Sequence, residues 1–313
     1  MSLSVDVLDH IRDANASDWD ALAGENNPFV EHAFLLALEE SKSVGPRTGW
    51  TPCHVVVRDG TKLVGAMPCY EKSDSYGEYI FDWSWAQAAP RARVRYYPKL
   101  TCAIPFVPAT GPRLLARDDD VRRALVRGAL DLARDRKCSS THVLFCRDDE
   151  CQAFVDAGFR RRASLQFHWR NDGYESFDAF LEKLQHEDRK QIKRERRRVH
   201  EAGVSIDVLN GTELDKRALD DVFRLYTSIS DRKWGRPYLT RAFFDVMPKE
   251  RALIVTAKLD ADIVAMTISF EKGKHIYGRH WGTSVDVPGL HFELCYYQLL
   301  ERAIATGCTL VEA

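Results

Sequence analysis

The order of predicted strands and helices repeats along the chain, and this repeat limits the fold more than any single motif does. The chain has 313 residues. Strand patterns at residues 53–58 and 62–71 meet at Asp59-Gly60, a pair typical of β-hairpin turns. A second strand pair follows at residues 253–258 and 263–271. The chain therefore favours two α/β halves, each built on a hairpin.

The elements around the two hairpins also correspond. In the first half we expect helices at 18–22, 34–40, 118–136 and 150–157 and a strand at 141–145. In the second we expect helices at 214–232, 241–246 and 290–306 and a strand at 308–312. The hairpins even repeat residues: Val55, Val64, Glu71 and Lys72 recur as Val255, Val264, Glu271 and Lys272. We interpret this as a tandem duplication, in which residues 30–160 and 205–313 superpose.

The composition is that of a soluble globular protein. Hydrophobic residues make up 45% of the chain, enough for real cores. No stretch approaches the roughly 18 uncharged apolar residues of a membrane span, and the acidic residues 1–20 lack a signal-peptide pattern. We therefore expect a cytoplasmic protein without a membrane span.

The cysteines and the net charge exclude two further classes of protein. Eight cysteines occur without a Cys-x-x-Cys pair, which indicates reduced thiols and no metal site. The formal net charge of −1 excludes a chain that is basic all over. Any contact with nucleic acid must therefore come from a local patch.

One such patch lies in the predicted helix at residues 177–202. Residues 186–201 carry four acidic and seven basic side chains: Arg189, Lys190, Lys193, Arg194, Arg196, Arg197 and Arg198. One interpretation is a solvated helix with ion pairs between successive turns. The other is a face that contacts the phosphates of RNA or of a phosphorylated substrate, through Arg194, Arg197 and Arg198.

A second pattern concentrates chemical groups near the end of the chain. In the predicted strand at 275–282, alternation places Tyr277, Arg279 and Trp281 on one face and His280 on the other. A helix follows Pro288-Gly289, and Glu293 falls within its apolar arc. This carboxylate either faces a cleft as a general base or is a negative charge stabilised by the dipole at the helix N-terminus.

Several segments resemble a known family. They are Tyr79-Ile80-Phe81-Asp82-Trp83-Ser84-Trp85-Ala86, Tyr96-Tyr97-Pro98-Lys99-Leu100, and residues 105–113, 189–198, 277–282 and 290–298. The repeated units resemble the GNAT N-acyltransferase fold, and two copies with a basic helix between them resemble the FemAB-like peptidoglycan aminoacyltransferases. The resemblance implies an α/β (α+β) fold of tandem GNAT-like domains with mixed central sheets, at 1–165 and 166–313. The basic helix at 177–202 belongs to the second domain, which we expect to be truncated at its C-terminus.

The resemblance also implies roles for individual residues. Glu293 is the expected base and Tyr277 a proton donor, while Arg279 and His280 stabilise charge. The expected substrate-binding residues, in a cleft between the domains, are Asp82, Trp83, Trp85, Tyr97, Lys99 and Arg113, with Trp281 and His291 from the second half. The alternatives are ordinary: His280 and the aromatic residues can be core residues, and His291 a solvated residue of the first helical turn.

Three functions remain open. The first is transfer of an aminoacyl group from charged tRNA to a cell-wall precursor or a similar small-molecule amine. The second is transfer of an acetyl or acyl group from acyl-CoA, for which residues 109–112 and 287–289 are the only candidate phosphate loops. The third is a binding module for a ligand or RNA that has kept the fold without the activity. No resident cofactor is indicated, because aminoacyl-tRNA or acyl-CoA would act as the donor substrate.

Overall fold

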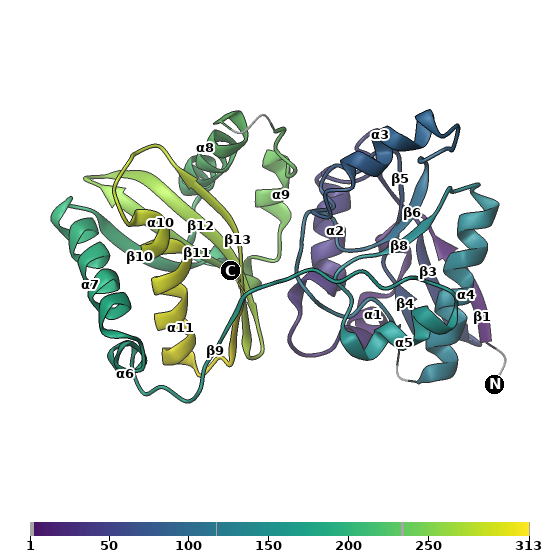
Figure 1. Cartoon of the computed structure of the whole chain (residues 1–313), viewed down its shortest axis with the longest axis horizontal. Coiled ribbons are helices and arrows are strands. Elements are labelled where there is room, and N and C mark those ends of the chain that lie inside the picture. The colour runs from purple at the N-terminus through teal and green to yellow at the C-terminus, as the bar shows by residue number, and fades with distance from the viewer. Residues whose placement is uncertain (1–2, 117, 233–234, 313) are drawn as a thin grey trace. The chain divides into compact units, whose positions relative to one another are not determined.

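The computed structural model describes residues 3–116, 118–232 and 235–312 (Figure 1). Contacts within the chain divide it into two compact units. The first comprises Met1–Ser164 and Tyr238–Phe243, and the second comprises Leu165–Pro237 and Phe244–Ala313. Each unit is described below by itself.

The first unit contains two four-stranded sheets, ordered β1-β3-β4-β7 and β2-β5-β6-β8. Their strands are β1 (Leu3–Leu8), β2 (Trp50–Pro52), β3 (His54–Asp59), β4 (Lys62–Met67), β5 (Cys69–Lys72), β6 (Lys99–Cys102), β7 (Leu115–Ala116) and β8 (Thr141–Val143). Neighbours are antiparallel except β6 and β8, which are parallel. The β3–β4 hairpin turns at Asp59-Gly60 as predicted, and Gly60 takes the positive φ of 61° that favours glycine.

Five α-helices accompany these sheets: α1 (Ala16–Ala23), α2 (His32–Glu40), α3 (Trp83–Arg91), α4 (Asp119–Asp135) and α5 (Asp148–Asp156). Helix α4 begins where the Asp118 side chain accepts a hydrogen bond from the Val121 amide at 2.8 Å. Its buried face packs Val121 and Leu125 against β3 and β4. Gly65 on β4 permits this approach, because a Cβ there would lie 2.3 Å from Val121.

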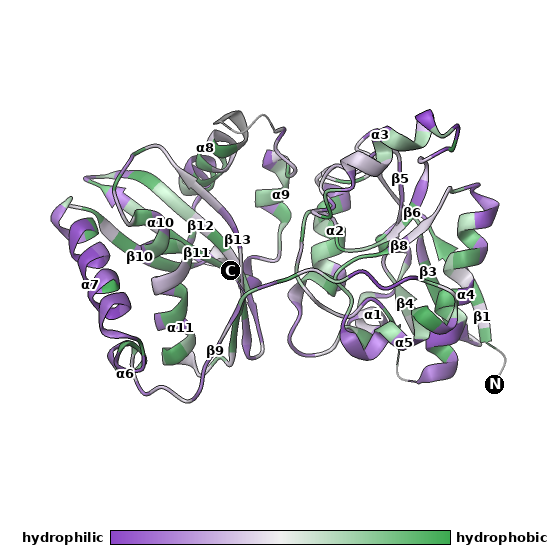
Figure 2. Cartoon of the chain, in the orientation of Figure 1, coloured by the Kyte–Doolittle hydropathy of each residue, from purple (hydrophilic) through white to green (hydrophobic). Residues whose placement is uncertain are grey.

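The second unit contains one six-stranded mixed sheet, ordered β10-β11-β12-β13-β14-β9. The strands are β9 (His168–Arg170), β10 (Ser205–Asn210), β11 (Ala252–Leu259), β12 (Asp262–Lys272), β13 (His275–Thr283) and β14 (Leu310–Glu312). Only β13 and β14 pair in parallel. Figure 2 shows the central strands β11 and β12 as largely hydrophobic, in agreement with their buried residues.

The α-helices of the second part of the chain are α6 (Phe177–Glu182), α7 (His186–Glu201), α8 (Lys216–Arg232), α9 (Arg241–Val246), α10 (Leu290–Phe292) and α11 (Gln298–Thr306), with a π-helical segment at Glu293–Tyr297. Short 3-10 helices occur at Ile11–Asp13, Pro28–Val30, Gly211–Glu213 and Lys249–Arg251. The single helix predicted at 177–202 is wrong in one respect, because it breaks between α6 and α7. Helix α6 ends at its C-cap Lys183, and Gln185 has the extended backbone of an N-cap, with φ −60° and ψ 151°, before α7 begins.

The two units share part of their order of connections. In each, an edge strand pairs antiparallel with a hairpin, and a later helical crossover joins two parallel strands: β6-α4-β8 and β13-α10-α11-β14. In the second unit these strands lie in one sheet, whereas in the first the hairpin and the parallel pair lie in two different sheets. The mixed central sheets predicted for both halves are therefore present. Their origin by duplication stays a prediction.

The described residues can be searched for a membrane-spanning helix, a metal site and disulfide bonds. Across residues 3–116, 118–232 and 235–312, no helix is long and apolar enough to cross a membrane. Over the same ranges, no group of three His, Cys, Asp or Glu side chains is placed to hold a metal ion. All eight cysteines are free thiols, and four of them are buried.

Candidate functional site

A β-bulge in β13 determines the geometry of the candidate site. On β12, Ile268 pairs with His280 while its neighbour Ser269 pairs with Gly278. One strand therefore advances two residues where the other advances one, and Arg279 is the extra residue. Bulges of this kind redirect side chains, and the sequence carried no signal for it.

The bulge corrects the predicted alternation of side chains. Residues opposite each other in a ladder share a face, so Tyr277 and His280 lie on one face of the sheet and Trp281 lies on the other. The rings agree with this: His280 packs edge-on against Tyr226 of α8, with centroids 5.0 Å apart, and Trp281 packs against His291 at 5.2 Å. The prediction that Tyr277 and Trp281 share a face is therefore wrong.

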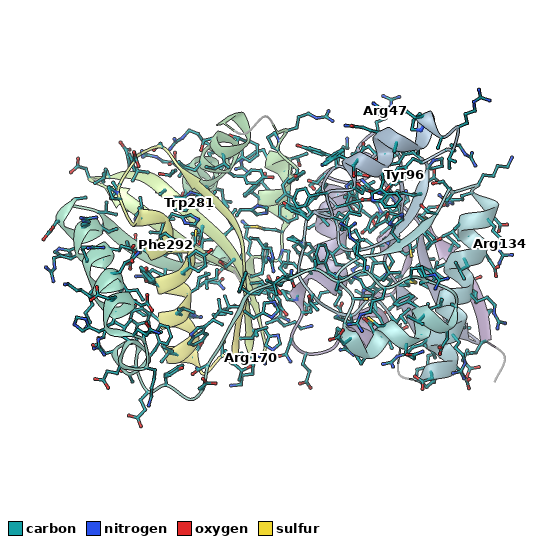
Figure 3. All side chains as sticks on the ribbon, in the orientation of Figure 1. Arg47, Tyr96, Arg134, Arg170, Trp281 and Phe292 are labelled. Carbon is teal, nitrogen blue, oxygen red and sulfur yellow. The ribbon has the colours of Figure 1, made fainter. Side chains whose placement is uncertain are left out.

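A small cavity of about 150 Å³ lies between β13 and the helical segment that follows Gly289. It is lined by Gly278, Arg279, His280, Trp281, His291, Cys295, Tyr296 and Leu299. Four residues predicted for the site thus meet here: Arg279, His280, Trp281 and His291. Figure 3 labels Trp281 and Phe292, which mark the strand and the helix start on either side.

Arg279 connects this cavity to a buried polar group, the Arg279–Glu312 cluster. The guanidinium of Arg279 forms an ion pair with Glu312, and the two side chains are 6% and 4% exposed. His168 lies 3.4 Å from the other Glu312 oxygen. The Arg279 guanidinium carbon is 5.5 Å from the Tyr277 ring centre, and the Tyr277 hydroxyl is 3.1 Å from His275 Nδ1. Arg279 is therefore held in place at the bulge, with its guanidinium on the face of the sheet that carries Tyr277 and Glu312.

Burial favours the neutral form of His280 and His275. It lowers the pKa of His280 to about 4, and the charge of Arg279 adds to the effect. Burial, with the nearby Arg170, also lowers the pKa of His275. The Cys295 thiol has its pKa raised to about 12 by burial, so it stays protonated and is a poor nucleophile.

Glu293 has different partners from those predicted. It is 3% exposed, and its carboxylate accepts hydrogen bonds from Arg196 Nε and Nη2, both at 3.1 Å, and from Gln298 at 2.7 Å. Arg196 also donates to Glu301 at 2.8 and 2.9 Å. Glu293 thus ties the helix to α7, and neither it nor Tyr277 lines the cavity. Its role as a base stays a prediction.

The π-helical segment explains one of these contacts. A π-helix repeats at five residues, so it places Gln298 above Glu293, where an α-helix would place Tyr297. Such segments often occur at functional sites. Hydrophobic periodicity cannot reveal them, because the apolar arc shifts only slightly.

Helix α7 carries a separate basic face. Arg194, Arg197 and Arg198 are exposed, as is Lys190, and all four fall within an arc of about 100°. None of the four forms an ion pair with a described residue. Figure 2 shows α7 as strongly hydrophilic. The predicted phosphate-contacting residues therefore share one solvated face.

In the first unit, the predicted residues Asp82, Tyr97 and Lys99 meet in a buried network that we call the Lys99 network. It consists of Ser75, Glu78, Asp82, Tyr96, Tyr97 and Lys99. The fully buried ammonium of Lys99 donates to Glu78 and Asp82, both at 2.7 Å, and to Ser75 at 2.9 Å. Sequence analysis missed Ser75 and Glu78, which carry no periodic signal.

The remaining predicted residues of the first unit do not join this network. Trp83 and Trp85 are exposed on α3, at 46% and 69%. Arg113 is fully buried and donates to the carbonyl oxygens of Leu144, Pro112 and Ala109, at 2.8, 3.0 and 2.9 Å. These bonds fix the loop around it. The substrate-binding roles of all three stay predictions.

The fold and its crossovers define a tandem GNAT-like protein with two mixed α/β units, as the sequence predicted. The chain belongs to the FemAB-like family, described as peptidoglycan biosynthesis/recognition, and the match covers residues 10–313. The sequence matches no curated protein.

Three solved structures share this fold at low identity. FemX is 12% identical, with 96% of this chain and 87% of that chain covered and a TM-score of 0.56. L-PGS from Bacillus licheniformis is 11% identical, with 96% and 75% covered and a TM-score of 0.56. A conserved protein of unknown function from Bacteroides thetaiotaomicron VPI-5482 is 11% identical, with 99% and 90% covered and a TM-score of 0.54. Similarity at this level concerns the fold alone.

Proposed function

We propose that this chain transfers an aminoacyl group from charged tRNA to an amine of a cell-wall precursor. Family membership supports the cell-wall context, and the GNAT-like fold supports acyl transfer. The observation that carries the proposal is the position of Arg279, which lines the cavity while Glu312 fixes its orientation.

The chemistry requires a fixed positive charge at the reacting carbonyl. The acceptor nitrogen forms a bond to the carbonyl carbon, the bond from that carbon to the donor's ester oxygen breaks, and the amine gives up a proton. The negative oxygen of the tetrahedral intermediate needs donors that are already in place. Arg279 supplies them, because its ion pair with Glu312 holds the guanidinium before substrate arrives.

The proton must then reach a base and the leaving oxygen must receive one. Tyr277 is the proposed donor, and its hydroxyl is hydrogen-bonded to the neutral imidazole of His275. Glu293 is the proposed base. It can accept a proton only when the substrate displaces Arg196 or Gln298 from one of its oxygens. This condition makes Glu293 the weaker part of the mechanism and the one to test first.

The basic face of α7 favours charged tRNA over acyl-CoA as the donor. Its four unpaired cations suit a run of backbone phosphates. An acyl-CoA donor would instead need a backbone phosphate loop, and residues 287–289 before α10 contain one glycine.

The deciding experiment compares donors by thermal shift and by transfer. Charged tRNA, uncharged tRNA and acetyl-CoA are added to the full chain, and each specific ligand should raise the melting temperature by mass action. Transfer of a labelled aminoacyl group to an amine-bearing cell-wall precursor should follow, and Arg279→Gln should abolish it while leaving tRNA binding intact. A shift with acetyl-CoA alone would replace the proposal with acetyl transfer, and tRNA binding without transfer would favour the binding module.

A further inference from the structure

Helix α3 and the loop after it lie outside the core, and we call residues 81–95 the α3 segment. None of residues 83–95 is buried. A helix of nine residues is marginal in water by itself, so it needs support from elsewhere. The Lys99 network supplies it, because the buried Asp82 carboxylate at the helix start accepts from the Tyr96 hydroxyl at 2.6 Å and from Lys99 at 2.7 Å. The segment is thus a loop closed at its base, and its side chains are not used for core packing.

The α3 segment begins with large apolar side chains that face water. Phe81, Trp83 and Trp85 are 76%, 46% and 69% exposed. Val94, after the helix, is 58% exposed. These two tryptophans are therefore surface residues and no part of the core. Such a group of exposed apolar side chains favours contact with another apolar phase, because removing each of them from water lowers the free energy.

The same segment is positively charged. Residues 83–95 contain no Asp, Glu or Lys and three arginines, all of them exposed: Arg91, Arg93 and Arg95. None of the three forms an ion pair with any residue that the structure describes. Arg162 donates to the carbonyl oxygen of Ile80 at 3.3 Å, so a fourth exposed cation lies beside the start of the segment. The α3 segment therefore complements a negatively charged surface.

Exposed apolar side chains distinguish the α3 segment from the basic face of α7. Helix α7 has exposed arginines but no exposed aliphatic, Phe, Tyr or Trp side chain. Cations alone suit the phosphates of a nucleic acid. Cations combined with exposed tryptophans suit the interface of an anionic bilayer, where indole rings lie among the headgroups and arginines attract the lipid phosphates. The composition of the α3 segment thus favours a lipid surface.

We propose that the α3 segment binds the surface of an anionic lipid bilayer. Its arginines contact the lipid phosphates, and Phe81, Trp83 and Trp85 enter the interface between headgroups and acyl chains. The strength of such binding depends on the apolar area that leaves water and on the attraction to anionic lipid, and the segment provides both. The inference goes beyond the proposed transfer reaction and does not depend on it.

The test measures sedimentation of the full chain with lipid vesicles. Vesicles of equal parts phosphatidylglycerol and phosphatidylcholine should bind the protein, and salt should weaken the binding. Vesicles of phosphatidylcholine alone should bind it much less. Changing Arg91, Arg93 and Arg95 together to Gln should weaken binding to the anionic vesicles by roughly a hundredfold. Changing Trp83 and Trp85 to Ala should weaken it by at least about tenfold.

The basic face of α7 provides a matched control. Changing Arg194, Arg197 and Arg198 to Gln removes the same number of exposed charges without touching an exposed ring, and it should leave vesicle binding unchanged. The two tryptophan changes should not lower the melting temperature, because neither side chain is buried. A loss of vesicle binding in that variant therefore reports the contact with lipid and not a loss of folding.

Failure of the full chain to sediment with the anionic vesicles would overturn the inference. An α7 variant that loses as much vesicle binding as the α3 variants do would overturn it as well. If the α3 variants bind vesicles normally and lose tRNA in filter binding, the segment stacks on the bases of a nucleic acid instead. None of these results bears on aminoacyl transfer, which the comparison of donors tests separately.

Discussion

Glu293 and Glu301 bind the same arginine, Arg196. Comparing variants of the two glutamates can therefore distinguish a catalytic role of Glu293 from a structural one. Both carboxylates accept from Arg196 at about the same distances, between 2.8 and 3.1 Å. The Glu293 side chain is 4% exposed and that of Glu301 is 37% exposed. Glutamine at either position keeps the shape and removes the charge. Comparing Glu293→Gln with Glu301→Gln therefore tests the proposed base against a control with the same partner.

The two variants should differ in how much stability they lose and in whether they lose turnover. Glu293→Gln weakens a largely buried ion pair while Arg196 keeps Glu301, so it should cost about 1–3 kcal/mol of stability. That corresponds to several degrees in melting temperature, at about 2–4 °C per kcal/mol. Glu301→Gln alters a more exposed pair and should cost at most about 1 kcal/mol. Loss of a general base should in addition lower turnover by roughly 10²–10⁴-fold in the Glu293 variant alone.

The assay combines thermal melts, filter binding of charged tRNA and single-turnover transfer on each variant. Donor binding should survive in both variants, because neither carboxylate lies on the exposed face of α7. The reasoning fails if Glu293→Gln keeps full turnover while losing stability. Glu293 would then serve only to hold α7 on the helix, and the proton would have to leave by the Tyr277–His275 pair.

Three further predictions follow from the contacts. Replacing Lys99 by Met should cost about 3–5 kcal/mol in urea unfolding, because two buried carboxylates lose their cation, whereas Lys62→Met at an exposed position should be nearly neutral. Replacing Arg194, Arg197 and Arg198 of α7 by glutamate should weaken tRNA binding and reduce the slope of its salt dependence by about one unit per lost phosphate contact. Unchanged binding would mean that α7 is only a solvated helix. The pKa of His280 is about 4 in the folded chain, below the ordinary value of 6.5. Between these two pH values His280 is protonated in the unfolded chain and neutral in the folded chain, so lowering the pH favours unfolding. Stability should therefore fall between about pH 6.5 and 4, and less steeply in His280→Gln.

Local rules predicted the elements that depend on local chemistry. Asp59-Gly60 forms its hairpin turn because glycine accepts the positive φ that the turn needs. Helix α4 was predicted at 118–136 and spans Asp119–Asp135, since Asp118 caps it and its apolar residues recur at helical spacing. The strand at 275–282 was also found, within β13 at His275–Thr283.

The features that position the candidate site depend on pairing between strands and helices. The bulge at Arg279 exists only relative to β12, so no pattern within β13 could show that Tyr277 and Trp281 face opposite ways. Sequence periodicity assigned residues to faces correctly as far as the bulge and incorrectly beyond it.

Helix α7 shows how one charged segment can satisfy two demands. Its inward residues Val199 and Ile192 pack on the core, and Arg196, beside them on the helical arc, is bound by Glu293 and Glu301. With the inner cation neutralised by acids of another helix, the outer arginines need no partner within α7 and stay available to solvent. Residues 186–201 have seven basic and four acidic side chains, and the basic ones include Arg196 on the inner side and Arg194, Arg197 and Arg198 on the outer side. A helix that was only solvated would gain from pairing its outer cations between successive turns, and α7 leaves them unpaired.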